Sequence, residues 1–224
     1  MQKILVVIQA RMGSTRLPGK TLMPLGNSTI IECLIHNLTS NKHDIQYIVA
    51  TSRNTENDQL EEFLRNRGIA CFRGSENDVL SRFIEISSKS NADYIVRATA
   101  DDPLMSGECL DILIDEMDRN KYDYTFMTGV PIGVSPEVIR KECFDRLKTI
   151  SDLSDRDREH VTIYLKEHPE LFKIGYIEAP EKYMYPTLSL TIDTLEQYNE
   201  MKKLYDTYGI DLSLAKAIDE LNEH

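Results

Sequence analysis

The chain has 224 residues, of which 41% are hydrophobic and 28% charged, a balance that predicts a globular domain with a buried core. Its net charge of −11, with no long basic run, argues against a nucleic-acid partner, and no apolar run approaches the length of a membrane span. The apolar run that begins at Ile4 is too short for a signal peptide and lacks a cleavage site, so we expect a cytoplasmic protein.

The first half of the chain alternates between strand-like and helix-like segments. Short apolar runs predict strands at 3–9, 47–51, 69–72 and 94–98. Apolar residues on one helical face predict a helix after each of them, at 30–38, 60–64, 79–84 and 110–117. This order predicts an α/β fold, a three-layer Rossmann-like arrangement in which helices cover both faces of a mixed, mostly parallel sheet.

The second half is less regular. Its predicted elements, in chain order, are a strand at 122–127, a helix at 156–168, strands at 172–177 and 188–192, and a helix opened by the capping-box pattern of residues 194–197. Pro169 is expected to end the helix that precedes it, since proline cannot continue a helix. We expect a single domain over residues 1–224, with residues 122–181 as an excursion that serves sugar binding or dimerisation.

A cationic loop with two glycines follows the first predicted strand, at residues 10–20. Glycine lets the backbone approach a phosphate closely, and successive N–H groups can form an anion-binding nest. The loop carries Arg11, Arg16 and Lys20, a concentration of positive charge that favours a polyphosphate ligand in an acidic protein. The alternative is a solvated turn whose charges have no ligand.

The end of this loop, Gly19-Lys20-Thr21, matches the end of a Walker loop. The spacing fails, however, because five residues separate Gly13 from Gly19 where the Walker pattern needs four. Pro18 also removes an N–H group that a Walker loop would direct at phosphate. The loop is therefore predicted to bind phosphate in another way.

Carboxylates follow two of the predicted strands. Asp101 and Asp102 come directly after the strand at 94–98, and Asp193 follows the strand at 188–192. Ligands of open α/β sheets bind beyond the carboxyl ends of the strands, and Mg²⁺ commonly takes one or two carboxylates plus substrate phosphates. The alternatives are a plain Asp-Pro turn and an aspartate that serves a helix N-terminus. Together with the cationic loop, these carboxylates would form a nucleotidyl-transfer site.

The loop at 10–20 closely resembles the signature loop of the cytidylyltransferases that make CMP-activated sugar acids, including the CMP-KDO synthetases. It is more similar still to the spore coat polysaccharide biosynthesis protein F group. Supporting stretches follow in the family's order at 72–80, 97–104, 158–162 and 190–194. The resemblance implies a nucleotide-diphospho-sugar transferase fold, Mg²⁺ as cofactor, and CTP with a sugar acid or sugar phosphate as substrates. A homodimer is implied by the resemblance alone.

The resemblance also implies roles for individual residues. The expected catalytic residues are Arg11 and Lys20, which match the phosphate-binding pair, and Asp101 and Asp193, which match the metal-binding pair. The implied nucleotide-binding residues are Ala10, Arg11, Gly13, Ser14, Arg16, Lys20, Arg73 and Thr99. The implied sugar-binding residues are Glu137, Arg158, Glu159 and His160.

The chain departs from the CMP-KDO synthetases near the nucleotide. Those enzymes usually have Gly-Asp-Glu-Pro where this chain has Ala100-Asp-Asp-Pro, and they place glutamine at the position of Thr99. These departures argue against KDO as the substrate.

The expected reaction is attack on the α-phosphorus of a nucleoside triphosphate with release of pyrophosphate, for surface polysaccharide or glycan biosynthesis. The protein would align the reactants and stabilise the developing charge, with no obvious general base. Two alternatives stay open. A glycosyltransferase can share this architecture, although Asp101-Asp102 is not the spaced Asp-x-Asp motif. A non-catalytic nucleotide-binding subunit would bind CTP without turnover, and the joint presence of Lys20, Asp101 and Asp193 argues against it.

Overall fold

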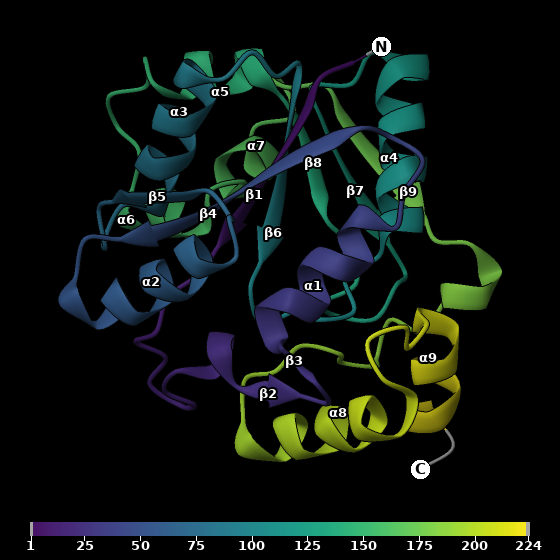
Figure 1. Ribbon diagram of the computed structural model, residues 1–224. Helices are drawn as coiled ribbons and strands as arrows, with labels where there is room; N and C mark the ends of the chain where they lie inside the picture. The colour runs from purple at the N-terminus through teal and green to yellow at the C-terminus, as the bar shows by residue number, and fades with distance from the viewer. Residues whose placement is uncertain (1, 223–224) are drawn as a thin grey trace.

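A seven-stranded sheet forms the centre of the molecule in the computed structural model, which describes residues 2–222 (Figure 1). In spatial order its strands are β5 (Cys71–Gly74), β4 (Ile45–Ser52), β1 (Ile4–Gln9), β6 (Tyr94–Thr99), β8 (Glu137–Arg140), β7 (Tyr124–Thr128) and β9 (Ile174–Glu178). Neighbouring strands run parallel except where β8 pairs with β6 and β7. The predicted α/β class, with a mixed and mostly parallel sheet, is confirmed.

The first strand shows why a continuous apolar run predicts a buried parallel strand. Val6 lies opposite Tyr47 of β4 and Val96 of β6, so β1 has a neighbour on each side. Successive side chains point to opposite faces, and Val6 joins one hydrophobic cluster while Val7 joins the other. Both faces are covered, so both must be apolar.

Helices cover the two faces of the sheet. One face carries α1 (Ile30–Thr39), α2 (Asp58–Asn66) and α4 (Gly107–Asn120). The other carries α3 (Val79–Lys89), α5 (Lys141–Leu147), α6 (Asp155–His160) and α7 (Ile163–Glu167). No helix within residues 2–222 is both long enough and apolar enough to cross a lipid bilayer.

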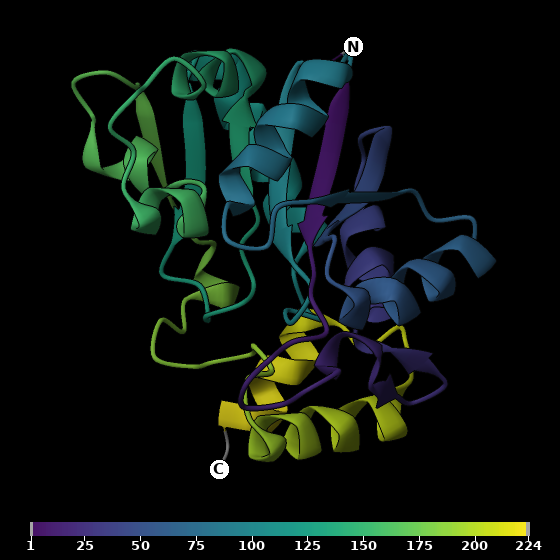
Figure 2. The same ribbon diagram turned by 90° about the vertical axis from the view of Figure 1, so that its left-hand side faces the viewer.

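The C-terminal helices α8 (Leu195–Tyr208) and α9 (Leu214–Asn222) lie beyond the carboxyl ends of the parallel strands, beside the hairpin of β2 (Pro24–Leu25) and β3 (Ser28–Thr29) (Figures 1 and 2). The predicted capping box is confirmed at the start of α8. The Thr194 side chain accepts a hydrogen bond from the Gln197 amide, and the Gln197 side chain accepts one from the Thr194 amide. In the hairpin, Gly26 has a φ of 57°, and a Cβ there would stand 2.8 Å from the carbonyl oxygen of Tyr205. The fold thus brings α8 against the segment that follows the cationic loop.

The strand expected at 188–192 does not form a ladder. This segment makes one isolated parallel bridge, in which Ser189 pairs with Ile132, and the Ile192 amide donates to the Asp101 carbonyl at 2.9 Å. Leu190 is fully buried against the core. The apolar pattern of this segment therefore reflects burial against the hydrophobic core rather than membership of the sheet.

The helix expected at 156–168 is divided into α6 and α7. The break lies at Val161, a buried β-branched residue with φ 55° and ψ −55°, a conformation that L residues rarely adopt. It turns Thr162 toward Glu137, to which the Thr162 hydroxyl donates at 3.1 Å. β8, α5, α9 and the β2–β3 hairpin were not predicted, and residues 122–181 supply β7, β8 and β9 to the main sheet.

Candidate functional site

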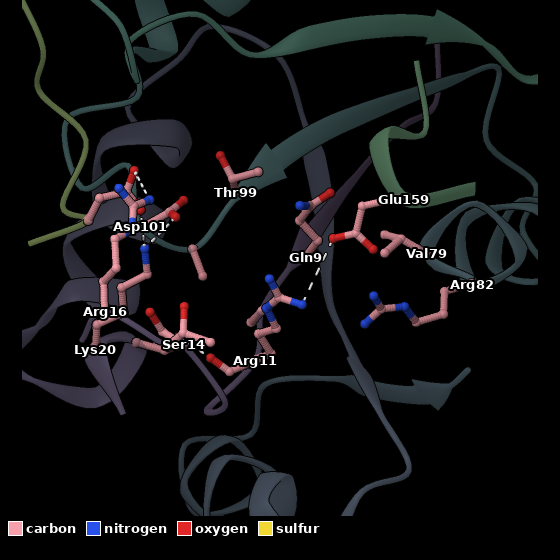
Figure 3. A pocket seen from close by; sticks show the side chains of 15 residues that line it. Gln9, Arg11, Ser14, Arg16, Lys20, Val79, Arg82, Thr99, Asp101 and Glu159 are labelled. Atoms are coloured by element: carbon pink, nitrogen blue, oxygen red, sulfur yellow. Dashed lines mark hydrogen bonds and ion pairs between the residues drawn. The ribbon is translucent and has the colours of Figure 1, made fainter. Parts of the chain in front are cut away.

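A polar hollow of about 180 Å³ opens at the carboxyl ends of β1 and β6 (Figure 3). The predicted site residues that line it are Ala10, Arg11, Ser14, Arg16, Lys20, Thr99, Asp101, Glu159 and Asp193. Gln9, Thr15, Thr21, Val79, Arg82 and Ala100 complete the lining. The four residues expected to be catalytic therefore lie in one hollow, although they are spread over most of the chain.

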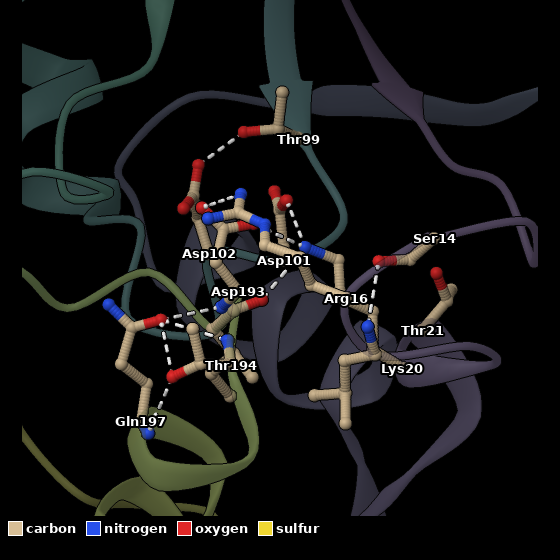
Figure 4. A network of polar contacts seen from close by, with 12 residues as sticks. Ser14, Arg16, Lys20, Thr21, Thr99, Asp101, Asp102, Asp193, Thr194 and Gln197 are labelled. Carbon is tan, nitrogen blue, oxygen red and sulfur yellow. Dashed lines mark hydrogen bonds and ion pairs between the residues drawn. The ribbon is translucent and has the colours of Figure 1, made fainter.

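Lys20 joins a network of polar contacts at one end of this hollow (Figure 4). Its ammonium nitrogen donates to Asp101 Oδ2 at 2.7 Å, to Asp193 Oδ1 at 2.8 Å and to the Ile192 carbonyl oxygen at 2.8 Å. These three acceptors use all three N–H bonds of the ammonium group, and only 10% of the side chain is exposed. Lys20 thereby joins the loop after β1 to the two carboxylate-bearing segments.

Arg16 adds a second cation at the same place. Its Nη2 lies 2.9 Å from Asp193 Oδ2, so Asp193 contacts one cation through each oxygen. Burial raises the pKa of Asp193, but the hydrogen bonds and charges of Lys20 and Arg16 outweigh burial and lower that pKa below its usual value. Asp193 is therefore ionised at neutral pH.

Asp102 differs from its neighbour Asp101. It is buried, and one carboxylate oxygen accepts a hydrogen bond from the Thr99 hydroxyl. Burial, followed by the charge of Asp101, raises the pKa of Asp102 to about 7. Of the adjacent pair, only Asp101 contacts Lys20 and lines the hollow.

Asp101 and Asp193 form a donor set that fits Mg²⁺. One oxygen of each carboxylate contacts the Lys20 nitrogen, which occupies the position between them, so Mg²⁺ would take oxygens that Lys20 does not contact, such as Asp101 Oδ1. Across residues 2–222, no three histidine, cysteine, aspartate or glutamate side chains cluster in a way that could hold a metal ion. Two carboxylates are too few for a closed zinc site, but they suit Mg²⁺, which keeps waters and takes phosphate oxygens as further ligands.

At the other end of the hollow, the cationic side chains make longer contacts with the protein. Arg11 Nη1 lies 3.8 Å from Glu76 and 3.9 Å from Glu159, and about half of the Arg11 side chain is exposed. Arg82 of α3 is only 5% exposed, and it donates from Nη1 to the Ala50 carbonyl at 3.3 Å. Burial lowers the pKa of Arg82, and its Nε has no hydrogen-bond partner in the described chain.

Arg82 was missed by the sequence analysis, although the sequence carried a signal for it. Val79, Phe83 and Ile86 form the buried face of α3, and Arg82 falls within that apolar stripe at helical spacing. An arginine on the buried face of a helix needs hydrogen-bond acceptors for its guanidinium group, because isolated buried charge is costly.

Other expected nucleotide-binding residues are engaged within the protein. Arg73 of β5 does not line the hollow, because its guanidinium group donates to Asp58, Glu61 and the carbonyls of residues 52 and 54, at 2.6 to 2.9 Å. Gly13 stands against the Glu56 carboxylate, which would overlap a Cβ at this position. Ser14 lines the hollow, and its hydroxyl also accepts from the Leu17 amide at 3.3 Å.

A second hollow of about 290 Å³ adjoins the first, and Thr99 lines both. Glu137 lies in its wall, 2.7 Å from Arg97 Nη1 and 2.8 Å from Lys166 Nζ, and it accepts further hydrogen bonds from two hydroxyl groups. Burial raises the pKa of Glu137, but Arg97 and Lys166 outweigh burial and lower that pKa to about 2. The rest of this wall includes the apolar side chains Met105, Phe126, Met127, Val130, Pro131 and Ile132.

The expected sugar-binding residues are not brought together. Glu137 lies in the second hollow and Glu159 in the first. Arg158 pairs with Asp78, the N-cap residue of α3, at 2.8 Å, and His160 is exposed at the end of α6. The sequence pattern of 158–160 therefore marks a helix that borders the first hollow through Glu159.

Known proteins resemble this chain along its whole length. A family model described as cytidylyltransferase matches residues 5–223. The chain is 38% identical to the spore coat polysaccharide biosynthesis protein SpsF of Bacillus subtilis (strain 168), over 100% of this chain and 96% of that protein. A solved cytidylyltransferase from Leptospira borgpetersenii superposes with a TM-score of 0.89 at 31% identity, covering 100% of this chain and 95% of that one. A CMP:2-keto-3-deoxy-manno-octonic acid synthetase complexed with CTP shares the fold, with a TM-score of 0.72 at 15% identity over 92% of this chain and 99% of that one.

Proposed function

The chain belongs to the cytidylyltransferase family, and we propose that it transfers CMP from CTP to a sugar acid or sugar phosphate, with release of pyrophosphate, in the biosynthesis of a surface polysaccharide. The observation that carries this proposal is the convergence of Asp101 and Asp193 on Lys20 within one polar hollow. The relationship to a spore coat polysaccharide biosynthesis protein supports the polysaccharide context.

In this proposal the cationic loop binds the triphosphate. Lys20 is fixed by three acceptors and Arg16 by Asp193, so both charges are positioned before the nucleotide arrives. Arg11 makes only long contacts, so it can turn toward a phosphate without losing a short hydrogen bond. Asp101 and Asp193 would hold Mg²⁺, which would neutralise negative charge on the phosphate oxygens.

The second hollow receives the acceptor. Because Thr99 lines both hollows, an acceptor there lies next to the nucleotide. Arg97 and Lys166 carry two positive charges and Glu137 one negative charge, and Asp102, whose pKa is about 7, adds only part of a second negative charge. The small positive excess favours an anionic acceptor, such as a sugar acid. An acceptor hydroxyl oxygen forms the new bond to the α-phosphorus, its proton is released to water, and the bond from the α-phosphorus to the departing pyrophosphate breaks.

Pyrophosphate release tests this function directly. The protein is incubated with Mg²⁺ and each of the four nucleoside triphosphates, against a panel of sugar acids and sugar phosphates. We expect release with CTP and one acceptor, and its loss when EDTA removes the metal. Asp101→Asn should abolish pyrophosphate release, while circular dichroism shows an intact fold. The control is Asp115→Asn, at a surface aspartate of α4 that pairs with Lys42, and it should leave pyrophosphate release unchanged.

The same assay separates the alternatives. A glycosyltransferase would consume a nucleotide sugar and release no pyrophosphate, and a non-catalytic subunit would bind CTP without release. Near-normal release by Asp101→Asn would refute the role of Asp101 as a metal ligand.

A further inference from the structure

We propose that Arg82 binds the pyrimidine ring of the nucleotide and is the residue that distinguishes CTP from UTP. This inference rests on the proposed function, since it assigns a role within the same nucleotide site.

The hollow has two chemically different ends. In Figure 3, Lys20 and Asp101 lie on one side, Arg82 and Val79 lie on the other, and Gln9 and Arg11 lie between them. Lys20 and Asp101 belong to the end that suits phosphate and metal. A nucleotide whose triphosphate occupies that end extends its nucleoside toward Arg82.

Arg82 is buried and forms no ion pair, and the more distant charges of Glu76, Glu159 and Asp78 do not outweigh the effect of burial on its pKa. No carboxylate of residues 2–222 lies within ion-pair distance of it, and only its Nη1 makes a hydrogen bond within the described chain. Nε is enclosed by the protein, whereas Nη2 makes no hydrogen bond within the described chain and is left available to a ligand. Figure 3 shows the guanidinium group pointing toward Arg11. A buried, unsatisfied cation is costly, so its retention is explained if a ligand supplies the missing acceptors.

Cytosine fits this donor better than uracil. The N–H groups of Nη2 need an acceptor, and cytosine presents the acceptors O2 and N3 side by side. Uracil carries a proton on N3, which would face a donor. Glu159, which borders the same end of the hollow, offers a carboxylate that can accept from the exocyclic amine of cytosine and that would repel the O4 of uracil.

Arg73, the arginine first expected on the nucleotide side, has no unpaired guanidinium nitrogen. Its Nε, Nη1 and Nη2 all donate to acceptors within the protein, at 2.6 to 2.9 Å. Two arginines of neighbouring segments thus differ in one respect that decides their roles. Arg73 is satisfied by the fold, and Arg82 is not.

Nucleotide binding without an acceptor tests the proposal. Isothermal titration calorimetry with CTP and with UTP, in the presence of Mg²⁺, gives the ratio of the two dissociation constants for wild type, Arg82→Met and Arg82→Lys. We expect wild type to prefer CTP and Arg82→Met to lose about 100-fold of that preference, mainly through weaker CTP binding. Arg82→Lys keeps the charge but not the planar guanidinium group that positions Nη2, so its preference should also fall. Arg119→Met, which removes an exposed arginine of α4, is the matched control and should keep the wild-type ratio.

Each outcome addresses a separate claim. If folded Arg82→Met and Arg82→Lys keep the wild-type preference, the role of Arg82 is refuted and the proposed function stands. If Arg73→Met loses the preference while both Arg82 variants keep it, the base contact belongs to Arg73. If wild type binds no nucleotide, the proposed function fails together with this inference. A cytidine triphosphate analogue with carbon in place of N3 should bind wild type more weakly than CTP, and Arg82→Met should not distinguish the two.

Discussion

Glu137 is a buried carboxylate between two cations, and replacing it with glutamine should destabilise the protein. The change Glu137→Gln removes the negative charge and leaves Arg97 and Lys166 without their partner. The pKa of Glu137 falls from its usual 4.5 to about 2 in the folded protein. A shift of this size corresponds to about 3 kcal/mol of folding free energy, a large part of a typical domain stability.

The same pKa shift fixes how this contribution depends on pH. Because the folded-state pKa is lower than the unfolded-state value, the carboxylate stabilises the fold fully above pH 4.5. The contribution is lost progressively as the pH falls from 4.5 toward about 2. The stability difference between wild type and Glu137→Gln should therefore be constant from neutral pH to about 5 and shrink below that.

Urea denaturation at pH 7, 5, 4 and 3 measures both effects as free energies of unfolding. Glu200→Gln, at an exposed glutamate of α8, is the matched control and should change stability by less than about 0.5 kcal/mol at every pH. A Glu137→Gln variant as stable as wild type at pH 7 would refute the reasoning. So would a difference that stays the same at pH 3.

Two further changes test the site and its support. Lys20→Met should reduce CTP-dependent pyrophosphate release by about 100-fold, because it removes the cation that contacts both Asp101 and Asp193. Unchanged release from a folded variant would contradict this. Gly26→Ala should lower the free energy of unfolding by about 2 kcal/mol, since φ is 57° and the new Cβ would stand 2.8 Å from the Tyr205 carbonyl oxygen. Thermal denaturation measures the second effect, and a midpoint equal to that of wild type would show that the hairpin shifts freely.

The sequence was sufficient for those features that depend on local pattern and strand direction. The apolar run of β1 predicted a strand buried on both faces, and Thr194 with Gln197 predicted the start of α8. Lys20 and Asp101 could be placed in one site because each follows a parallel strand, and the carboxyl ends of such strands meet at one edge of the sheet.

The errors arose where contacts distant in sequence decide the local structure. The segment ending at Ile192 has the pattern of a strand, but it makes only one isolated bridge, to Ile132, and does not join the sheet. Its hydrogen bond to the Asp101 carbonyl brings Asp193 to the site. The break at Val161 accompanies the hydrogen bond from Thr162 to Glu137, a contact between segments distant in sequence that no helical periodicity records. Arg73 and Arg82 carry the same functional group, and only their surroundings show which one is already satisfied.

The hydrogen bond between Lys20 and Asp193 joins residues 173 positions apart, so its two partners are synthesised at very different times. As the chain leaves the ribosome, β1 and its loop emerge early, and the aspartate that completes the site emerges only after all seven sheet strands. Closing so long a loop is entropically costly and comes late in folding. Until then Lys20 lacks one of its two carboxylates, so the site proposed for nucleotide and metal stays incomplete in the nascent chain.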